Sequence, residues 1–507
     1  MTKTIHSFSL FTATIISVMI LCQSGWCGDN RTQQIGELME RFSSERCFSG
    51  VVLVAEAGEI IFEGSYGVAD IGAKIPVAPQ MSFCIGSMSK QFAAMVAMQL
   101  VEKQQLKLDA TVTKYLPEYP SASGDRITVH HLLSHSSGIL QDNPLVGAFA
   151  KNKQRANTRD EMLSYFQDSA LLFAPGEGFQ YSNFNYNLLV MIMEEITGKP
   201  YPQLLREMIL DPLHMSATGT TGVDSPDQQL ALGYEYRLLQ EPLVAPPSDP
   251  STCLGAGDLF ANAHDLLIWD KALYTDVLLS ESMRETMFTP RLNGFGYGWQ
   301  VGKYPIGDGK DSVAAIFHDG GIPGYQSIII RIPEDRRLLV ILSNGSEPWI
   351  HTRLSRVRQD VAPAILAVLY NRPYVFHRKS AAYELAVADT VSGGSSVADG
   401  FARLAQVRPD DYSFDPEEFY CVGLSFAWDK RYDKAVEFLK IAVEKLGVDQ
   451  MAEAWQCHNV YGESLFMLGM IEPGCAQFER SLELKPNNTF AVRALKAAEP
   501  YRKNSGN

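Results

Sequence analysis

The sequence lacks the short patterns that mark several common enzyme classes. No G-x-S-x-G pentapeptide is present, which argues against the nucleophile elbow of the α/β-hydrolases. There is no C-x-x-C pair and no recognisable set of zinc ligands. His131 and His135 have the spacing of two histidines in a zinc helix, but the glutamate of H-E-x-x-H is missing, and a structural role is favoured for both.

Basic residues are too few to favour binding to nucleic acid. The chain has 44 Lys and Arg against 58 Asp and Glu, which gives a formal net charge of −14 at pH 7. A nucleic acid or an anionic membrane requires a basic face on its partner, so neither is expected. The 507 residues, 46% of them hydrophobic and 20% charged, predict a soluble globular protein with more than one domain.

The hydrophobic run near the N-terminus is too short to span a membrane. Residues Leu10–Cys22 carry no charge, but these 13 residues fall short of the ~20 that a spanning helix needs. A basic start at Lys3 and small residues up to Gly28 complete the pattern of a secretory signal peptide. We expect residues 1–27 to be removed, and the mature protein to be exported as a periplasmic or secreted protein with no stable membrane span.

An oxidising compartment permits disulfides, but the sequence does not specify a pairing. Six cysteines remain after the signal peptide, and six cysteines allow 15 pairings. Their wide spacing favours an interpretation of most of them as small buried apolar residues. They are Cys47, Cys84, Cys253, Cys421, Cys457 and Cys475.

Two predicted β-hairpins lie far apart in the chain. Phe48–Gly67 contains two β-rich runs around a turn at Glu56. Ser327–Ile332 and Arg337–Ser343 are two more such runs, separated by the turn-forming Pro333. The residues between the hairpins are mostly helical in pattern, with helices predicted to begin near residues 87 and 183. We therefore predict an α/β fold with an antiparallel sheet that is closed by the two ends of the domain.

The composition changes after residue 372, and the chain beyond Ser392–Ser396 is helical in pattern. Small residues recur there at an offset of 39, which resembles tetratricopeptide repeats; a generic helical cap is the alternative. The paired positions are Gly423, Ala435 and Ala442 with Gly462, Gly474 and Ser481. The predicted domains are a signal peptide (1–27), a hydrolase domain (28–372), a linker with leading helices (373–410) and an all-α domain (411–507).

A serine and a lysine three residues apart carry the strongest chemical signal. Ser87-Met88-Ser89-Lys90 is an S-x-x-K motif at a predicted helix start. This spacing places both side chains on one helix face. A serine hydroxyl needs a neighbouring base, and lysine serves as one only if burial or a helix N-terminus lowers its pKa. The motif is weak alone, so its value depends on the residues that follow it.

Two further groups follow in the order that a hydrolase site requires. Tyr181 is a candidate for relaying a proton to the leaving group, and Asn183 for binding a substrate amide or carbonyl. His318 precedes Gly320 and Gly321, and a glycine edge strand lets backbone N–H groups approach a substrate. The N–H groups of Ser87 and Gly321 are the predicted oxyanion donors.

The order S-x-x-K, Y-x-N and H-x-G resembles the serine β-lactamase and D-Ala-D-Ala peptidase superfamily, in its class C-like branch with esterases and D-aminopeptidases. The resemblance spans about residues 48–346. It implies an antiparallel sheet flanked by helices, with Ser87 as nucleophile, Lys90 and Tyr181 in proton transfer, and Asn183 and His318 in substrate binding. Connecting segments support it: Ile127–Gly138, Pro175–Glu177, Pro212–Met215 and Gly255–Leu259.

One position departs from the β-lactamases of this branch, which usually carry lysine where this chain has His318. A neutral histidine offers a substrate carboxylate a hydrogen bond without a full ion pair, provided that its pKa stays near 6.5. The chain is therefore expected to be a serine hydrolase that acts through an acyl-enzyme on an ester or amide, more like a peptidase or esterase than a β-lactamase.

The expected partners are a small-molecule or peptide substrate and a protein bound by the helical tail, with no metal or cofactor. The alternative is a catalytically silent binding protein that uses the same cleft and tail. Sequence does not choose among peptide, ester and lactam substrates.

Overall fold

The computed structural model describes residues 30–44, 48–140, 154–165, 171–224, 230–236, 241–346, 357–374, 379–392, 396–409, 411–451 and 453–502. The predicted signal peptide and Cys47 lie outside the described residues. Among the helices in the described ranges, none has the length and hydropathy that crossing a membrane requires.

The central sheet is antiparallel and joins the two predicted hairpins edge to edge. Its six strands run in the order β10-β11-β12-β13-β1-β2. Both hairpins are confirmed, and β1 pairs with β13 from Gly50↔Ser343 to Glu56↔Arg337, so the two ends of the domain close the sheet as predicted. The bounds are β1 Gly50–Glu56, β2 Glu59–Tyr66, β10 Gln300–Ile306, β11 Asp311–Ile322, β12 Tyr325–Ile332 and β13 Arg337–Ser343.

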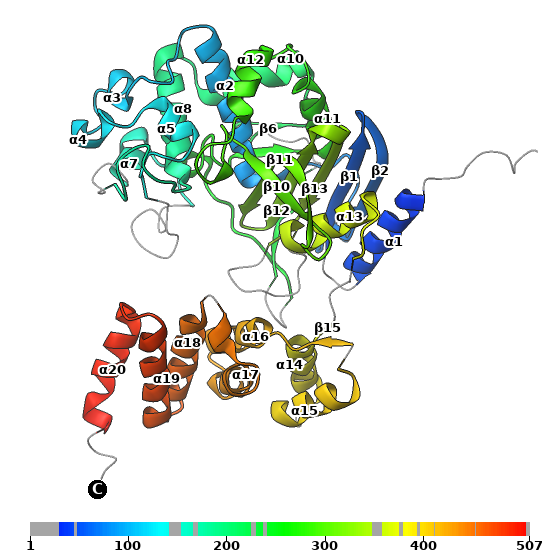
Figure 1. The fold of residues 1–507 in the computed structure, drawn as a ribbon, viewed down its shortest axis with the longest axis vertical. Coiled ribbons are helices and arrows are strands. Elements are labelled where there is room, and N and C mark those ends of the chain that lie inside the picture. Colours follow the sequence, from blue (N-terminus) through cyan, green and yellow to red (C-terminus); the bar gives the residue numbers. More distant parts are fainter. Residues whose placement is uncertain are drawn as a thin grey trace, which may run out of the picture.

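Both faces of this sheet are covered, because its central strands are apolar on both sides. One face packs with α1 (Asn30–Ser44) and α13 (Ala362–Leu369) around a cluster that includes Val52, Ile328 and Ile341. The other face packs against α2 (Ser89–Glu102), α8 (Asn183–Thr197) and α11 (Ala263–Ala272) in a larger cluster. In Figure 1 these helices and the sheet form one body, in which α1 packs against β2 while α13 packs against α1 and β10. The candidate site residues Ser87, Asn183 and Gly321 lie where the starts of α2 and α8 meet the end of β11.

The helical C-terminal region has a hydrophobic cluster of its own, drawn from α14 to α18. The helices pair as hairpins, α16 with α17 and α18 with α19, and glycines lie where the paired helices are closest (Figure 1). A Cβ at Gly462 would lie 2.9 Å from Phe478, and one at Gly423 would lie 2.6 Å from Leu439. The bounds are α14 Ala381–Ser392, α15 Val397–Val407, α16 Pro416–Trp428, α17 Tyr432–Glu444, α18 Ala454–Met467, α19 Ile471–Leu484 and α20 Thr489–Arg502.

Within the described ranges, Cys84, Cys253, Cys457 and Cys475 are free thiols. Cys421, Cys457 and Cys475 are buried in the helical region, whereas Cys84 and Cys253 are partly buried near the sheet and the site. Burial is the environment that the sequence interpretation favoured for most of them.

Candidate active site

Ser87 lies on a sharp turn rather than inside the helix that follows it. The turn η1 (Gly86–Met88) is a 3-10 segment, and α2 begins at Ser89. Gly86 has φ +51°, which a side chain would strain, and its ideal Cβ would lie 2.9 Å from the Gly321 nitrogen. The Ser89 hydroxyl donates to the Gly86 carbonyl at 2.7 Å and so closes the turn. The turn therefore presents Ser87 at the helix start, next to the end of β11.

Lys90 is fully buried, and its amine contacts three oxygens. The Nζ atom lies 3.2 Å from Ser87 Oγ, 2.8 Å from Asn183 Oδ1 and 2.6 Å from the Ala256 carbonyl oxygen. The amide and carbonyl oxygens can only accept hydrogen bonds, whereas the Ser87 hydroxyl can also donate one. The S-x-x-K spacing thus brings its two side chains into contact.

The surroundings of Lys90 favour its neutral form. Burial lowers its pKa to about 7, and the nearby Cys253 and Asp258 oppose that shift. Asp258 is itself fully buried, and burial raises the pKa of its carboxyl to about 7. Its Oδ1 accepts from the Gly255 N–H at 2.8 Å, which shapes the turn that carries the Ala256 carbonyl. The sequence indicates Gly255–Leu259 only as a connecting segment of the family, and nothing in it identifies Asp258 as a group near Lys90.

Tyr181 and Asn183 reach the site from the start of α8. Asn183 is the first residue of that helix, and its Oδ1 binds Lys90. The Tyr181 ring centroid is 4.8 Å from Lys90 Nζ. Burial raises the pKa of the Tyr181 phenol well above its usual value, although the nearby Ser87 hydroxyl opposes the rise. Among the described residues its hydroxyl makes no hydrogen bond of good geometry. The phenol is therefore a neutral acid at pH 7.

The end of β11 leaves an unpaired backbone edge beside Ser87. Pairing with β10 stops at Gln300↔Phe317, while pairing with β12 continues to Ile322↔Tyr325. Hydrogen-bonded and non-bonded pairs alternate along an antiparallel ladder, so a two-residue turn after Ile322 directs the Gly321 N–H away from β12. Gly320 permits the close approach, because a Cβ there would lie 1.9 Å from the Ile85 carbonyl oxygen. Gly321 and Ser87 line the same pocket.

His318 is buried on β11, on the sheet face that carries the site. Its Nδ1 lies 2.6 Å from the Asp319 carbonyl oxygen, which can only accept, so Nδ1 carries a proton. Burial lowers the pKa of the imidazole to about 4. In the neutral ring Nε2 is then an acceptor, and among the described residues it has no partner. This changes the expectation from sequence in two ways. The pKa does not stay near 6.5, and the one N–H of the neutral ring is already donated to the Asp319 carbonyl, so the ring has none left for a substrate carboxylate.

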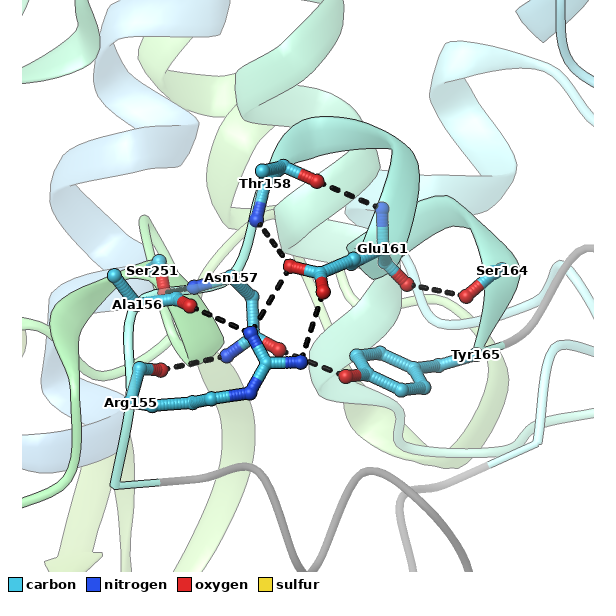
Figure 2. A network of polar contacts seen from close by, with 8 residues as sticks. All are labelled: Arg155, Ala156, Asn157, Thr158, Glu161, Ser164, Tyr165 and Ser251. Carbon is cyan, nitrogen blue, oxygen red and sulfur yellow. Dashed lines mark hydrogen bonds and ion pairs between the residues drawn. The ribbon is translucent and has the colours of Figure 1, made fainter.

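The pocket beside Ser87 has one wall that sequence reasoning did not identify. It includes Ser248, Thr252 and Cys253, none of which belongs to a recognised motif. Hydrogen bonds tie this wall to the start of α7 (Arg159–Ser164), where Thr158 and Glu161 form a capping box. As Figure 2 shows, the Asn157 N–H donates to Ser251 Oγ at 2.9 Å, next to Thr252. The pocket wall at residues 248–253 is therefore held in place by Asn157, which lies 94 positions before Ser251 in the chain.

His131 and Asn344 have structural contacts. His131 Nδ1 accepts from the Thr128 N–H at 3.1 Å and caps α5 (Val129–Leu133). The Asn344 side chain donates to the Val68 and Leu232 carbonyls and accepts from the Ser49 hydroxyl, so it links three segments of the chain.

Comparison with known proteins agrees with this geometry. Residues 32–362 match the family model described as Beta-lactamase. The chain is 29% identical over 408 residues to penicillin-binding protein 4* of Bacillus subtilis (strain 168), covering 75% of this chain and 86% of that protein.

Two solved structures are similar at a TM-score of 0.57. D-amino acid amidase from Ochrobactrum anthropi, complexed with L-phenylalanine amide, is 26% identical over 68% of this chain and 99% of its own. The octameric penicillin-binding protein homologue from Pyrococcus abyssi is 26% identical over 67% of this chain and 77% of its own. Because the family model covers more than half of the sequence, the chain belongs to the β-lactamase family and is a β-lactamase-related serine hydrolase.

Proposed function

We propose that the protein hydrolyses an ester or amide without a carboxylate near the scissile bond, through an acyl-enzyme on Ser87. The main support for this proposal is the contact of the Lys90 amine with three oxygens. A neutral amine has two hydrogens and one lone pair. If the two hydrogens bind Asn183 and Ala256, at 2.8 and 2.6 Å, the lone pair is left for the Ser87 hydroxyl at 3.2 Å. This is the arrangement of a nucleophile with its general base.

The groups around Ser87 supply each proton that the reaction moves. Ser87 Oγ attacks the carbonyl carbon while its proton passes to the Lys90 amine, and the N–H groups of Ser87 and Gly321 bind the oxyanion. The bond to the leaving group then breaks. The neutral Tyr181 phenol protonates the departing oxygen or nitrogen and regains a proton from the Lys90 ammonium. Water attacks the acyl-enzyme in the same way and releases the acid and free Ser87.

The charges in the site favour substrates without a carboxylate near His318. Lys90 is largely neutral above pH 7, and the buried His318 ring presents an acceptor rather than a cation. Among the described residues, the pocket beside Ser87 is lined by small polar and apolar groups without a charged side chain. An anionic substrate would lose water there without gaining an ion pair.

A three-substrate comparison tests the proposal. We expect hydrolysis of a p-nitrophenyl ester and of a D-amino-acid amide at higher kcat/KM than a chromogenic cephalosporin, with Ser87→Ala as the blank. No turnover of any substrate above that blank would favour the alternative of a silent binding protein.

Replacing His318 by lysine should change the substrate preference. The new ammonium offers the carboxylate of a cephalosporin a charged hydrogen bond, worth about 1.5–3 kcal/mol or roughly 10- to 150-fold in kcat/KM. We expect the cephalosporin-to-ester ratio to rise by up to that factor in His318→Lys. In the native protein the ratio should stay constant from pH 8 down to about pH 5, because burial lowers the His318 pKa to about 4. A native protein that prefers cephalosporins would contradict this assignment.

The helical tail is proposed to bind a protein partner and to supply no catalytic group. The tail has its own cluster of buried residues, distinct from the two clusters around the sheet. A chain ending at Pro373 should therefore keep ester hydrolysis within a few-fold of the full chain, measured as kcat/KM after circular dichroism has verified its folding. Complete loss in a folded truncation would show that the tail shapes the site.

We also propose that the protein is exported with loss of its first 27 residues. The uncharged run Leu10–Cys22 is the supporting observation. N-terminal sequencing of the native protein should begin near Gly28. A soluble cytoplasmic protein that retains Met1 would refute the proposal.

A further inference from the structure

His135 packs its ring against that of the proposed proton donor, Tyr181. Its imidazole is fully buried, and the ring centroid is 4.4 Å from that of Tyr181 and 5.2 Å from that of Tyr186. Burial lowers its pKa well below the usual value, so the ring stays neutral. None of the chemical steps above uses this residue.

His135 accepts hydrogen bonds from both neighbours of Tyr181 in the chain. The Gln180 N–H donates to the His135 carbonyl at 2.9 Å. The Ser182 N–H donates to His135 Nδ1 at 3.2 Å, and the Asn185 side-chain amide lies 3.1 Å from the same nitrogen. A backbone N–H can only donate, so Nδ1 is an acceptor and the proton of the neutral ring is on Nε2.

The backbone of His135 is in an unusual conformation that brings these contacts together. Its φ of +56° is uncommon for a residue with a side chain, and histidine and asparagine adopt it more readily than most. The neighbouring Ser137 hydroxyl donates to Asn185 Oδ1 at 2.6 Å and so fixes the amide that faces His135. The segment from His135 to Ser137 therefore contacts the start of α8 through several hydrogen bonds.

We propose that His135 is a positioning residue for Tyr181, and that its bond to the Ser182 N–H sets the phenol for proton transfer to the leaving group. The inference rests on the proposed function. Tyr181 has no well-formed hydrogen bond through its hydroxyl among the described residues, so its place depends on its ring contacts and on the backbone at Gln180 and Ser182. A shift of about 1 Å in a reacting group can cost roughly 100-fold in rate.

The experiment compares the p-nitrophenyl and ethyl esters of one acid by kcat/KM in the full chain. Ethoxide needs a proton to leave, whereas p-nitrophenolate departs without one. His135→Phe keeps a ring but leaves the Ser182 N–H without its acceptor. We expect it to lower the ethyl-to-nitrophenyl ratio by about 10- to 100-fold. His135→Asn retains an acceptor near the Nδ1 position and tolerates the positive φ, so it should restore most of the ratio.

Three further measurements separate this role from a loss of folding or of the proposed function. His131→Asn, in the same segment but without contact to Tyr181, should leave the ratio unchanged. In a Tyr181→Phe background, His135→Phe should cause no further fall in the ratio. A fluorophosphonate, whose fluoride leaves without a proton, should still label Ser87 in both His135 variants.

The outcomes are distinct. Equal loss on both esters in His135→Phe, with Ser87 still labelled, would overturn the positioning role and leave the proposed function intact. Absence of Ser87 labelling in the native protein would overturn the proposed function itself.

Discussion

Ser87→Ala should abolish covalent labelling and lower kcat/KM for an ester by roughly 10⁴-fold or more. The hydroxyl is the proposed acyl acceptor, and its oxygen lies 3.2 Å from the Lys90 amine. Incubation of the native protein with a fluorophosphonate or a penicillin should give a single adduct by intact mass. Peptide mapping should place that adduct on Ser87.

Ser248→Ala is the matched control, because Ser248 lines the same pocket but belongs to no motif. It should be labelled to the same extent as the native protein, and its turnover should change little. Equal labelling of Ser87→Ala and the native protein would show that another residue is the nucleophile.

Loss of the Lys90 amine should lower kcat/KM by about 10²- to 10⁴-fold, the range of one general base. Lys90→Ala removes the group, while Lys90→Arg keeps a cation that has no lone pair at any working pH. Both variants should therefore be nearly inactive, although only the first removes the charge. An active Lys90→Arg would show that the residue acts as a cation and not as a base.

The native pH profile gives a second test of the same assignment. In the proposed mechanism the reactive form of Lys90 is the neutral amine, and burial lowers its pKa to about 7. Activity should therefore rise as pH increases through about 7 and level off above it. Replacing the exposed Lys103 at the end of the same helix should not change the pH at which activity rises. A profile that is flat from pH 5 to 9 would exclude Lys90 as the base.

The layout of the hydrolase fold could be predicted from local patterns. Both hairpins are predicted by the β-rich runs around Glu56 and Pro333. They pair into one sheet because the strands that meet, β1 and β13, are buried on both faces. The start of α2 was placed two residues early, since the chain makes a 3-10 turn at Ser87 before the regular helix begins. Local spacing does not distinguish these two kinds of turn.

The sequence by itself determined which side chains are available for chemistry: a serine and a lysine three apart, a tyrosine and an asparagine at a helix start, and a histidine before two glycines. It also indicated that Ser87 and Lys90 share a face, because helical spacing is local.

Only the tertiary structure decided their electrostatics. The Lys90 amine is hydrogen-bonded to Asn183 and Ala256, which lie 93 and 166 positions further along the chain. The burial that lowers its pKa comes from the packing of those segments around it. Likewise, burial and one carbonyl oxygen make His318 a neutral acceptor. A pKa depends on how much water surrounding segments exclude and on which charges they bring near, and both are properties of distant parts of the chain packed together.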